Sequence, residues 1–434
     1  MDSFDQALRD ATAKGVLPGT CVIAADKQGN ILHSASSGSY INSPIWQTRL
    51  ASEGLSAQAK PPAEVEHDSK PFGPDTVCWI ASMTKLLTTV CVMKCVEQDL
   101  LKLDDDVTTT FLPEFEDVQV LERMEDDGKS GETPVLRPSK GKITLRNLLI
   151  HSSGITYEFM HAKLLSWRLW NNADLRRQGI KKTHEDRTEV SHAYRVPLVF
   201  DPETSWTYGY GIDWAGLVLE RATSQTLESF MRQHIFTPLS MDDTTFEPLK
   251  LPHLASRIAG MTVRSDDGKL IPQHETTTTS PLGGVRHAGG SGLASTANDY
   301  IKVLISLLVS DGRLLKPETV EYMFQPHLKD PKHLRKMHAN PEAFGLAGNI
   351  PPGLKVDFGL GGIMNLEKMP TGRSPGGLQW GGYPNLFWWM NPKDGICGCY
   401  FSQLVPPGDP ESFEMYRKFE TEVNRTFKRE MVRL

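Results

Sequence analysis

Two polar residues three positions apart, Ser82 and Lys85, are the pair in this sequence best suited to chemistry. A short apolar run rich in β-forming residues leads to Ser82, and an apolar helical pattern continues to about Leu100. The spacing predicts that both side chains share one face of a helix that Ser82 opens. A serine hydroxyl is a weak nucleophile until a base takes its proton, and desolvation favours the neutral, basic form of a buried lysine. Free N–H groups at the helix start could stabilise an oxyanion beside Ser82.

The pattern Ser-x-x-Lys is common, and a second copy stands at Ser139-Lys140-Gly141-Lys142. That copy lies in a Pro/Lys/Gly stretch without a preceding apolar run, so we interpret it as a solvated loop. The structural alternative for Ser82 and Lys85 is an ordinary helix cap and a surface charge. The long apolar helix favours the chemical interpretation, but other parts of the chain must decide.

A rival nucleophile motif occurs at Gly372-Arg373-Ser374-Pro375-Gly376, which matches the Gly-x-Ser-x-Gly elbow of α/β-hydrolases. That elbow uses the N–H of the residue after the serine to hold an oxyanion, and proline has no N–H. The stretch also lies in a Pro/Gly turn with no helical pattern after it. We therefore reject Ser374 as a nucleophile.

Composition limits the classes of function. The 434 residues include 47 basic and 53 acidic side chains, giving a net charge of -6, so neither a nucleic-acid nor a membrane partner is indicated. The N-terminus shows no secretory signal, and the six cysteines show no spacing typical of a disulfide scaffold. We expect a cytoplasmic, reduced protein. The thirteen histidines show no metal-binding spacing, and we predict neither a metal nor a cofactor.

Hydrophobic periodicity and turn residues predict the elements. Helices are expected at about residues 4–11, 82–100, 144–149, 155–180, 213–222, 226–236, 298–310, from 317, and 410–427. Strands are expected at 20–25, 31–35, 258–263, 269–271, 358–364, 378–382, 386–390 and 396–402. Loops are expected at 40–74, where the loop could shape an entrance, and at 111–142 and 325–355.

This order predicts an α+β fold, an α/β sandwich in which an antiparallel sheet takes strands from both ends of the chain and is flanked by helices. A mostly helical insertion separates the two sets of strands. We expect a single domain over residues 1–434. Its α/β half would comprise about 1–100 and 250–434, and its helical half about 101–249.

Five stretches in order resemble the serine β-lactamase and penicillin-binding-protein superfamily, and within it the class C-related esterases and transesterases. They are Ser82-Met83-Thr84-Lys85 with Leu101-Lys102-Leu103-Asp104-Asp105, the stretch 143–154, Tyr208-Gly209-Tyr210, the glycine turn at 288–300, and Gln379-Trp380-Gly381-Gly382-Tyr383. The blocks at 84–89, 213–216, 358–363 and 382–385 are most similar to the fungal lovastatin-type polyketide acyltransferases. The resemblance extends from near the N-terminus to about residue 405 and implies a β-lactamase/transpeptidase-like fold.

The resemblance also implies roles for individual residues. Ser82 would be the acylated nucleophile, Lys85 its base or proton relay, and Tyr208 the third catalytic residue. Which of Lys85 and Tyr208 takes the serine proton stays open, because the two groups titrate as a pair. The oxyanion hole would consist of the backbone N–H groups of Ser82 and Tyr383.

Departures from the β-lactamase pattern indicate the substrate. Tyr210 stands where β-lactamases have asparagine, Trp380 where they have lysine, and Gly381 where they have threonine. These losses argue against lactams and peptides and for esters or thioesters with a larger apolar acceptor. Substrate contacts are expected from Trp380, Gly381, Gly382 and Trp388, with Trp167, Trp170 and Trp389 as further aromatic candidates.

The sequence thus predicts a serine acyltransferase that moves an acyl group from a thioester or ester donor to an alcohol of a secondary metabolite. Its partners would be the small-molecule donor and acceptor, and the polyketide resemblance adds an acyl carrier protein as a possible donor. One alternative is a carboxylesterase that uses the same residues. The other is a catalytically idle binding module of the same fold.

Overall fold

The computed structural model describes residues 1–41, 69–126, 132–178, 188–273, 285–339 and 348–431. Most of the expected loop at 40–74 therefore lies outside the described residues. Its two ends form a small pair of strands, β3 (Ser39–Ile41) and β4 (Ser69–Pro71).

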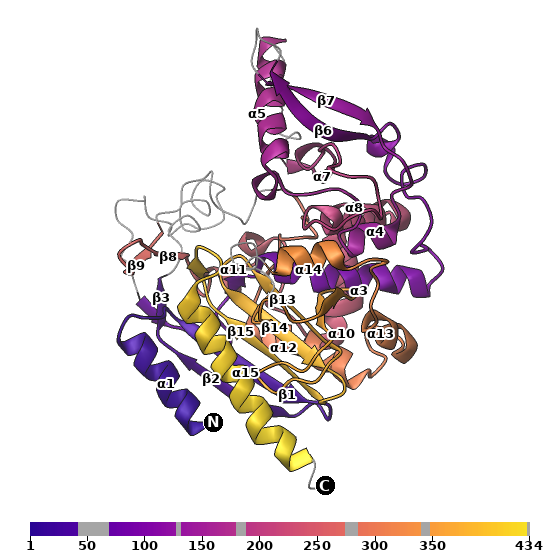
Figure 1. Ribbon diagram of the computed structural model, residues 1–434. Coiled ribbons are helices and arrows are strands. Elements are labelled where there is room, and N and C mark those ends of the chain that lie inside the picture. The colour runs from indigo at the N-terminus through magenta and orange to yellow at the C-terminus, as the bar shows by residue number, and fades with distance from the viewer. Residues whose placement is uncertain (42–68, 127–131, 179–187, 274–284, 340–347, 432–434) are drawn as a thin grey trace.

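A seven-stranded antiparallel sheet forms the lower part of the molecule in Figure 1. Its order is β11 (Val356–Phe358), β12 (Ile363–Asn365), β13 (Gly377–Gly382), β14 (Leu386–Asn391), β15 (Ile396–Phe401), β1 (Thr20–Asp26) and β2 (Ile31–Ser37). Because β1 pairs with β15, the sheet joins the two ends of the chain. The sequence prediction of one strand over 358–364 was wrong, since residues 359–362 turn between β11 and β12 and Gly359 N–H donates to Gly362 O.

Two terminal helices cover one face of the sheet. They are α1 (Asp2–Ala13) and α15 (Pro410–Met431), which lie side by side in Figure 1. Aromatic and aliphatic side chains fill the space between these helices and the sheet: Phe4, Leu8, Phe387, Trp389, Tyr416 and Phe419. The alternation of side chains along β14 therefore directs Trp389 toward α15 and Trp388 toward the opposite face.

The opposite face carries the larger core, which joins the sheet to the middle of the chain. Helix α12 (Ala297–Val309) packs on β1, β14 and β15, and α3 (Thr84–Glu97) packs on α8 (Gly211–Thr223). Thr296 caps α12, and Thr144 caps α4 (Leu145–Leu149) in a capping box with Asn147. All six cysteines are buried and free.

The middle of the chain projects away from the sheet at the top of Figure 1. The further helices are α5 (Ala162–Arg177), α7 (Val190–Ala193), α9 (Leu227–Met231), a π-helical turn (Arg232–Phe236), α10 (Thr237–Leu239), α11 (Pro252–Ala255), α13 (Pro317–Met323) and α14 (Lys332–His338). The remaining small sheets are β6 (Gln119–Asp126) with β7 (Glu132–Pro138), β5 (Cys78–Trp79) with β10 (Ala294–Ser295), and β8 (Thr262–Arg264) with β9 (Leu270–Pro272) and β16 (Leu404–Val405).

Two loop predictions were wrong. The stretch 111–142 contains the β6–β7 hairpin, so the insertion is not helical throughout, and 325–355 contains α14. In β6 only Val120 and Leu121 are buried, and in α14 only Leu334 and His338. Elements with so few buried positions show no clear apolar period, and acidic or basic composition then suggests a loop. Within the described residues no helix is both long and apolar enough to cross a bilayer.

Candidate active site

Ser82 lies in a sharp turn between β5 and α3. The turn is a 3₁₀ helix (Ala81–Met83), and α3 begins at Thr84, so Ser82 does not open the α-helix itself as the sequence predicted. Ala81 has a φ of 43°, a left-handed conformation that costs free energy for any residue with a Cβ. This backbone strain falls directly before Ser82, whose side chain keeps a small exposed surface of 8%.

Lys85 is buried one turn further along and is aimed at Ser82. Its Nζ donates to Gly290 O at 2.7 Å, to Tyr157 OH at 3.0 Å and to Ser82 Oγ at 3.3 Å. These three acceptors match the three N–H donors of an ammonium group. The lysine side chain is only 2% exposed, so its polar contacts all lie inside the protein.

Tyr208 completes the group that the sequence predicted. Its hydroxyl is hydrogen-bonded to Ser82 Oγ at 2.6 Å, and its ring centroid lies 4.7 Å from Lys85 Nζ. The backbone on each side is held close, because Thr156 Oγ1 donates to Tyr208 O and a Cβ on Gly209 would lie 2.3 Å from Thr156 Cα. The structure therefore brings Ser82, Lys85 and Tyr208 together.

The end of β13 lies against the Ser82 turn. A Cβ on Gly382 would stand 2.6 Å from Ile80 O, so only glycine allows this approach. The next residue, Tyr383, is 42% exposed, and its ring packs on Trp79 with centroids 6.2 Å apart. The side chain of Gln403 holds the backbone of Trp79. Its Oε1 accepts from the backbone N–H of Trp79, and its Nε2 donates to the carbonyl oxygen of Trp79. The turn that follows β13 therefore begins close to Ile80, two residues before Ser82.

The tryptophans expected to contact substrate have different positions. Trp380 is 3% exposed, and its Nε1–H donates to Tyr208 OH at 3.3 Å, so it contacts the Ser82–Lys85–Tyr208 group directly. Trp388 faces the same side but is fully buried, which leaves it no surface for a substrate to touch. Trp389 points to α15 on the far face, and Trp167 lines a separate hollow with α7 residues. For Trp388 and Trp389 the expectation of a substrate contact was wrong, because both belong to the core.

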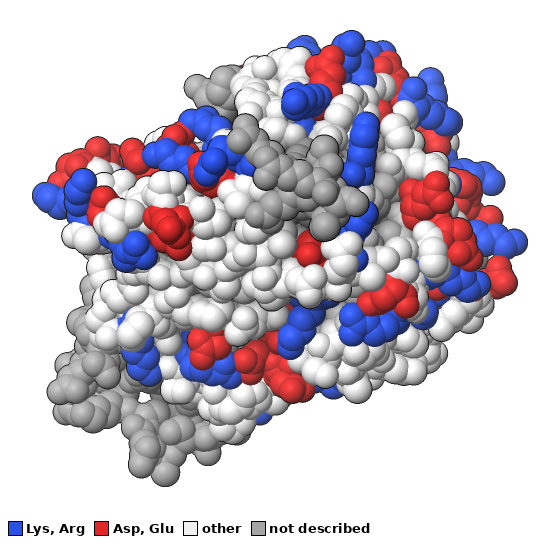
Figure 2. Space-filling model, turned by 90° about the horizontal axis from the view of Figure 1, so that it is seen from below, with Lys and Arg blue, Asp and Glu red and all other residues white. Residues whose placement is uncertain are grey.

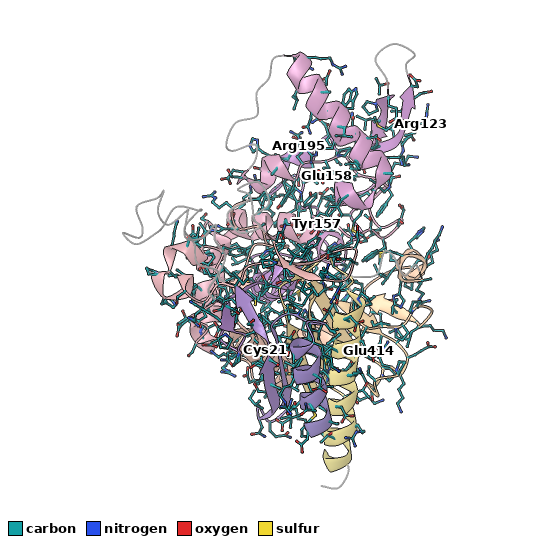
Figure 3. All side chains as sticks on the ribbon, turned by 90° about the vertical axis from the view of Figure 1, so that its left-hand side faces the viewer. Cys21, Arg123, Tyr157, Glu158, Arg195 and Glu414 are labelled. Atoms are coloured by element: carbon teal, nitrogen blue, oxygen red, sulfur yellow. The ribbon has the colours of Figure 1, made fainter. Side chains whose placement is uncertain are left out.

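Four residues of the site were missed as site residues by sequence reasoning. Tyr157 and Gly290 accept hydrogen bonds from Lys85, and Asp213 Oδ1 accepts from Gly290 N–H at 2.8 Å. His151 lies edge-on to Tyr208, with ring centroids 4.9 Å apart. Figure 3 shows Tyr157 at the junction between the projecting part and the sheet. All four lie within or near the family-like stretches, which is the signal that could have pointed to them.

Two buried ionisable groups near Ser82, Tyr157 and His151, have shifted pKa values. Burial raises the pKa of the Tyr157 phenol well above its usual range, with the neighbouring Tyr208 adding to the rise. Burial, and secondarily the charge of Lys85, lowers the pKa of His151, so that ring is neutral. Among the described residues neither His151 nitrogen has a hydrogen-bond partner.

The rejected motifs lie away from this cluster. Ser374 sits in the turn between β12 and β13, where its Oγ donates to Asp394 and no helix follows. Ser139 directly follows β7, where its backbone N–H donates to Val118 O. In the described ranges no three His, Cys, Asp or Glu side chains are arranged to hold a metal ion.

Known proteins match this chain over nearly its full length. A family model described as beta-lactamase matches residues 4–421. Monacolin J acid methylbutanoyltransferase of Aspergillus terreus is 36% identical over 423 residues, covering 96% of this chain and 94% of that protein. Lovastatin esterase of Penicillium rubens is 33% identical over 438 residues, covering 98% of each.

Solved structures agree. Unliganded simvastatin synthase from Aspergillus terreus superposes with a TM-score of 0.83 at 33% identity, covering 98% of each chain. These relatives confirm the predicted fold, and they confirm that the chain is an enzyme of acyl transfer. The chain belongs to the beta-lactamase family and is similar, within it, to the fungal lovastatin-type acyltransferases.

Proposed function

We propose that Ser82 is the nucleophile of a serine acyltransferase that accepts an acyl group from a thioester or ester and passes it to an alcohol. The observation that carries the proposal is the contact of Ser82 Oγ with Tyr208 OH at 2.6 Å and with Lys85 Nζ at 3.3 Å in a buried setting. A hydroxyl with two proton-transferring groups in contact can be activated for attack on a carbonyl carbon.

We propose further that Tyr208 takes the serine proton. In its phenolate form Tyr208 accepts the proton as Ser82 Oγ bonds to the carbonyl carbon, and Lys85, as an ammonium, balances the negative charge. The Trp380 N–H that donates to the Tyr208 oxygen stabilises that charge as well. The proton then passes to the departing thiolate or alkoxide. In the second half-reaction the acceptor alcohol gives its proton to Tyr208 and attacks the acyl-enzyme; the bond from the acyl carbon to Ser82 Oγ then breaks, and Tyr208 returns the proton to Ser82 Oγ.

The oxyanion of each tetrahedral intermediate would be held by the backbone N–H groups of Ser82 and Tyr383. The close packing of Gly382 against Ile80 supports this, because it holds the end of β13 at a fixed distance from the serine turn. N–H groups held in place need no reorganisation when charge develops, which is the main source of such stabilisation. Trp380, Gly381 and Gly382 would line the acyl site.

For substrates, we propose a short acyl thioester or ester as donor and an alcohol of a polyketide-type secondary metabolite as acceptor. The names of the similar proteins, a methylbutanoyltransferase and a lovastatin esterase, support this class. An acyl carrier protein is a candidate donor. On the face in Figure 2 basic and acidic side chains alternate around a broad uncharged area, so charge does not mark a docking place for it there.

We also propose that the chain acts as one domain in the cytoplasm. The single-domain proposal is supported by one core cluster that runs from Ile23 through Leu149 to Trp388 and so joins both halves of the chain. Six buried thiols that form no disulfide are suited to a reducing compartment.

A partition experiment tests transfer against hydrolysis. The enzyme is incubated with a methylbutanoyl thioester, with and without a panel of polyketide alcohols, and ester and free acid are measured by mass spectrometry. Ester formation that depends on the alcohol and disappears in Ser82→Ala is expected. Free acid alone, with every alcohol, would overturn transfer in favour of the carboxylesterase, which the lovastatin esterase relationship also favours. An idle binding module would leave Ser82 unlabelled by a fluorophosphonate probe.

A further inference from the structure

A tight glycine turn connects a buried carboxylate to the lysine of the site. Gly290 N–H donates to Asp213 Oδ1 at 2.8 Å, and Gly290 O accepts from Lys85 Nζ at 2.7 Å. The approach is so close that a Cβ on Gly290 would lie 2.3 Å from Asp213 Oδ2. One residue earlier, Thr88 of α3 donates to Gly289 O at 2.6 Å. The turn is therefore clamped between α8 and α3, and Lys85 is held by it.

Burying the Asp213 carboxylate in this position costs free energy. It is 1% exposed, and its second oxygen, Oδ2, has no hydrogen-bond partner among the described residues. A buried carboxylate with an unsatisfied oxygen destabilises a fold unless a positive charge compensates it. Burial raises the pKa of Asp213 from its ordinary 3.8 to about 6, and the charge of Lys85 opposes that rise. At neutral pH the Asp213 carboxylate is therefore mostly ionised.

Three buried phenols among the described residues also interact with the charge of Asp213. They come from three different segments: Tyr157, Tyr194 and Tyr210, and burial raises the pKa of each. Tyr210 OH donates to Glu158, which is engaged by Arg168 and so has its own counter-charge. Lys85 is thus the positive group of the described residues that acts on Asp213.

We propose that Asp213 is a positioning residue of the acyl-transfer reaction: it fixes the Gly290 carbonyl that holds Lys85, and it supplies a negative charge near Lys85. The proposal rests on the proposed role of Ser82, Lys85 and Tyr208. Asp213 touches no reacting atom. Asp213 acts through its hydrogen bond with Gly290 and through the electric field of its carboxylate.

The variants separate position from charge. Asp213→Asn keeps an oxygen for the Gly290 N–H and removes the charge, whereas Asp213→Ala removes both. Thr88→Val is the matched control, since it removes a neutral hydrogen bond to the same turn at almost constant volume. The measured quantity is the second-order rate constant for labelling of Ser82 by a fluorophosphonate between pH 5 and 10, which needs no knowledge of the substrate.

Loss of a nearby negative charge weakens whichever base serves Ser82. In Asp213→Asn the acidic limb of the pH profile is expected to move about one unit lower, and the plateau rate to fall about tenfold. Asp213→Ala should fall about tenfold further, because Lys85 then loses its support. Thr88→Val should keep the wild-type limb.

Two results would overturn the inference. If Asp213→Asn keeps the wild-type limb and plateau, the charge has no role. If Asp213→Ala and Asp213→Asn have the same plateau rate, the hydrogen bond from the Gly290 N–H to residue 213 has no role. Failure of the proposed function looks different, because the wild-type protein itself would then resist labelling, or Ser82→Ala would be labelled equally.

Discussion

Two buried polar clusters lie on opposite faces of β13. Gln379 contacts one cluster, and the next residue of the strand, Trp380, contacts the other. Gln379 points toward α15 and accepts a hydrogen bond from Arg373, which forms an ion pair with Glu420 at 3.0 Å. Trp380 points the other way and donates to Tyr208 OH at 3.3 Å. Both clusters are largely buried, yet their charges are arranged differently.

Behind the sheet one positive and one negative group are in direct contact, and both are fully buried. In the Ser82 cluster Lys85 donates to uncharged oxygens, and Asp213 accepts from a backbone N–H. In both clusters some buried polar atoms have no hydrogen-bond partner within the described chain, among them Asp213 Oδ2 and Arg373 Nη1. Direct pairing holds a structure together, whereas separated charges leave groups that can still exchange protons. Changes in the first cluster should therefore lower stability, and changes in the second should lower rate.

The largest effect is expected for Tyr208→Phe, which removes one hydroxyl from the reactive cluster. If Tyr208 takes the serine proton, the rate of Ser82 acylation should fall by a factor of about 10² to 10⁴. The ring contacts with His151 and Trp380 persist, so unfolding by urea should change little. Stopped-flow acylation by an activated ester gives the rate. Substantial remaining activity would contradict the assignment of Tyr208.

Arg373→Met tests the ion pair between Arg373 and Glu420 behind the sheet. It leaves Glu420 buried without its counter-charge, and we expect the free energy of unfolding to fall by about 3–5 kcal/mol. The double variant Arg373→Met/Glu420→Leu should recover most of this loss, because no lone charge remains. Urea titration measures both. Folded Arg373→Met should still be labelled at Ser82 at the wild-type rate; a lower rate would show that the two faces are coupled.

Asp213→Asn tests how much the buried charge of Asp213 lowers the free energy of unfolding. The folded-state pKa of about 6 lies above the ordinary 3.8, so the protonated form stabilises the fold fully below pH 3.8, and this contribution is lost as the pH rises to about 6. The Asp213→Asn variant has no carboxyl group to ionise, so it does not lose this stability as the pH rises. Relative to wild type it should gain up to about 3 kcal/mol between pH 4 and pH 6 and stay level above.

Urea titrations of both proteins at several pH values give this difference. A variant that is more stable yet slower would mark Asp213 as kept for function. A constant difference across the pH range would instead show that Asp213 is charged in the folded state even at pH 4.

The sequence predicted the site as far as local spacing and family resemblance reach. Ser82 and Lys85 are neighbours on one turn, so spacing alone paired them. Tyr208 is 126 residues from Ser82, and only the resemblance connected it. Gly290 is 205 residues from Lys85 and 77 from Asp213, and no periodicity reports a contact of that range. Such contacts depend on how α3, α8 and the glycine turn pack.

The fold shows the same limit. Strands and helices with a continuous apolar face, such as β1, β15 and α12, were predicted because burial dictates their pattern. The β6–β7 hairpin was not, because its strands bury few side chains and are stabilised by pairing with each other. Ser82 itself sits in a 3₁₀ turn rather than at the start of α3, since the left-handed Ala81 depends on surrounding structure that the local sequence does not specify.

The smallest effect is expected for Trp380→Phe, for which the adjacent strand offers a matched control. Trp380 and Trp388 are directly paired across β13 and β14 and face the same side. The Trp380 N–H donates to Tyr208, whereas the Trp388 N–H has no partner among the described residues. Losing one hydrogen bond of about 1 kcal/mol should slow acylation about fivefold in Trp380→Phe. Trp388→Phe should lower stability through a cavity and leave the rate unchanged. Equal rates in the two variants would show that the hydrogen bond from the Trp380 N–H to Tyr208 makes no contribution to the rate.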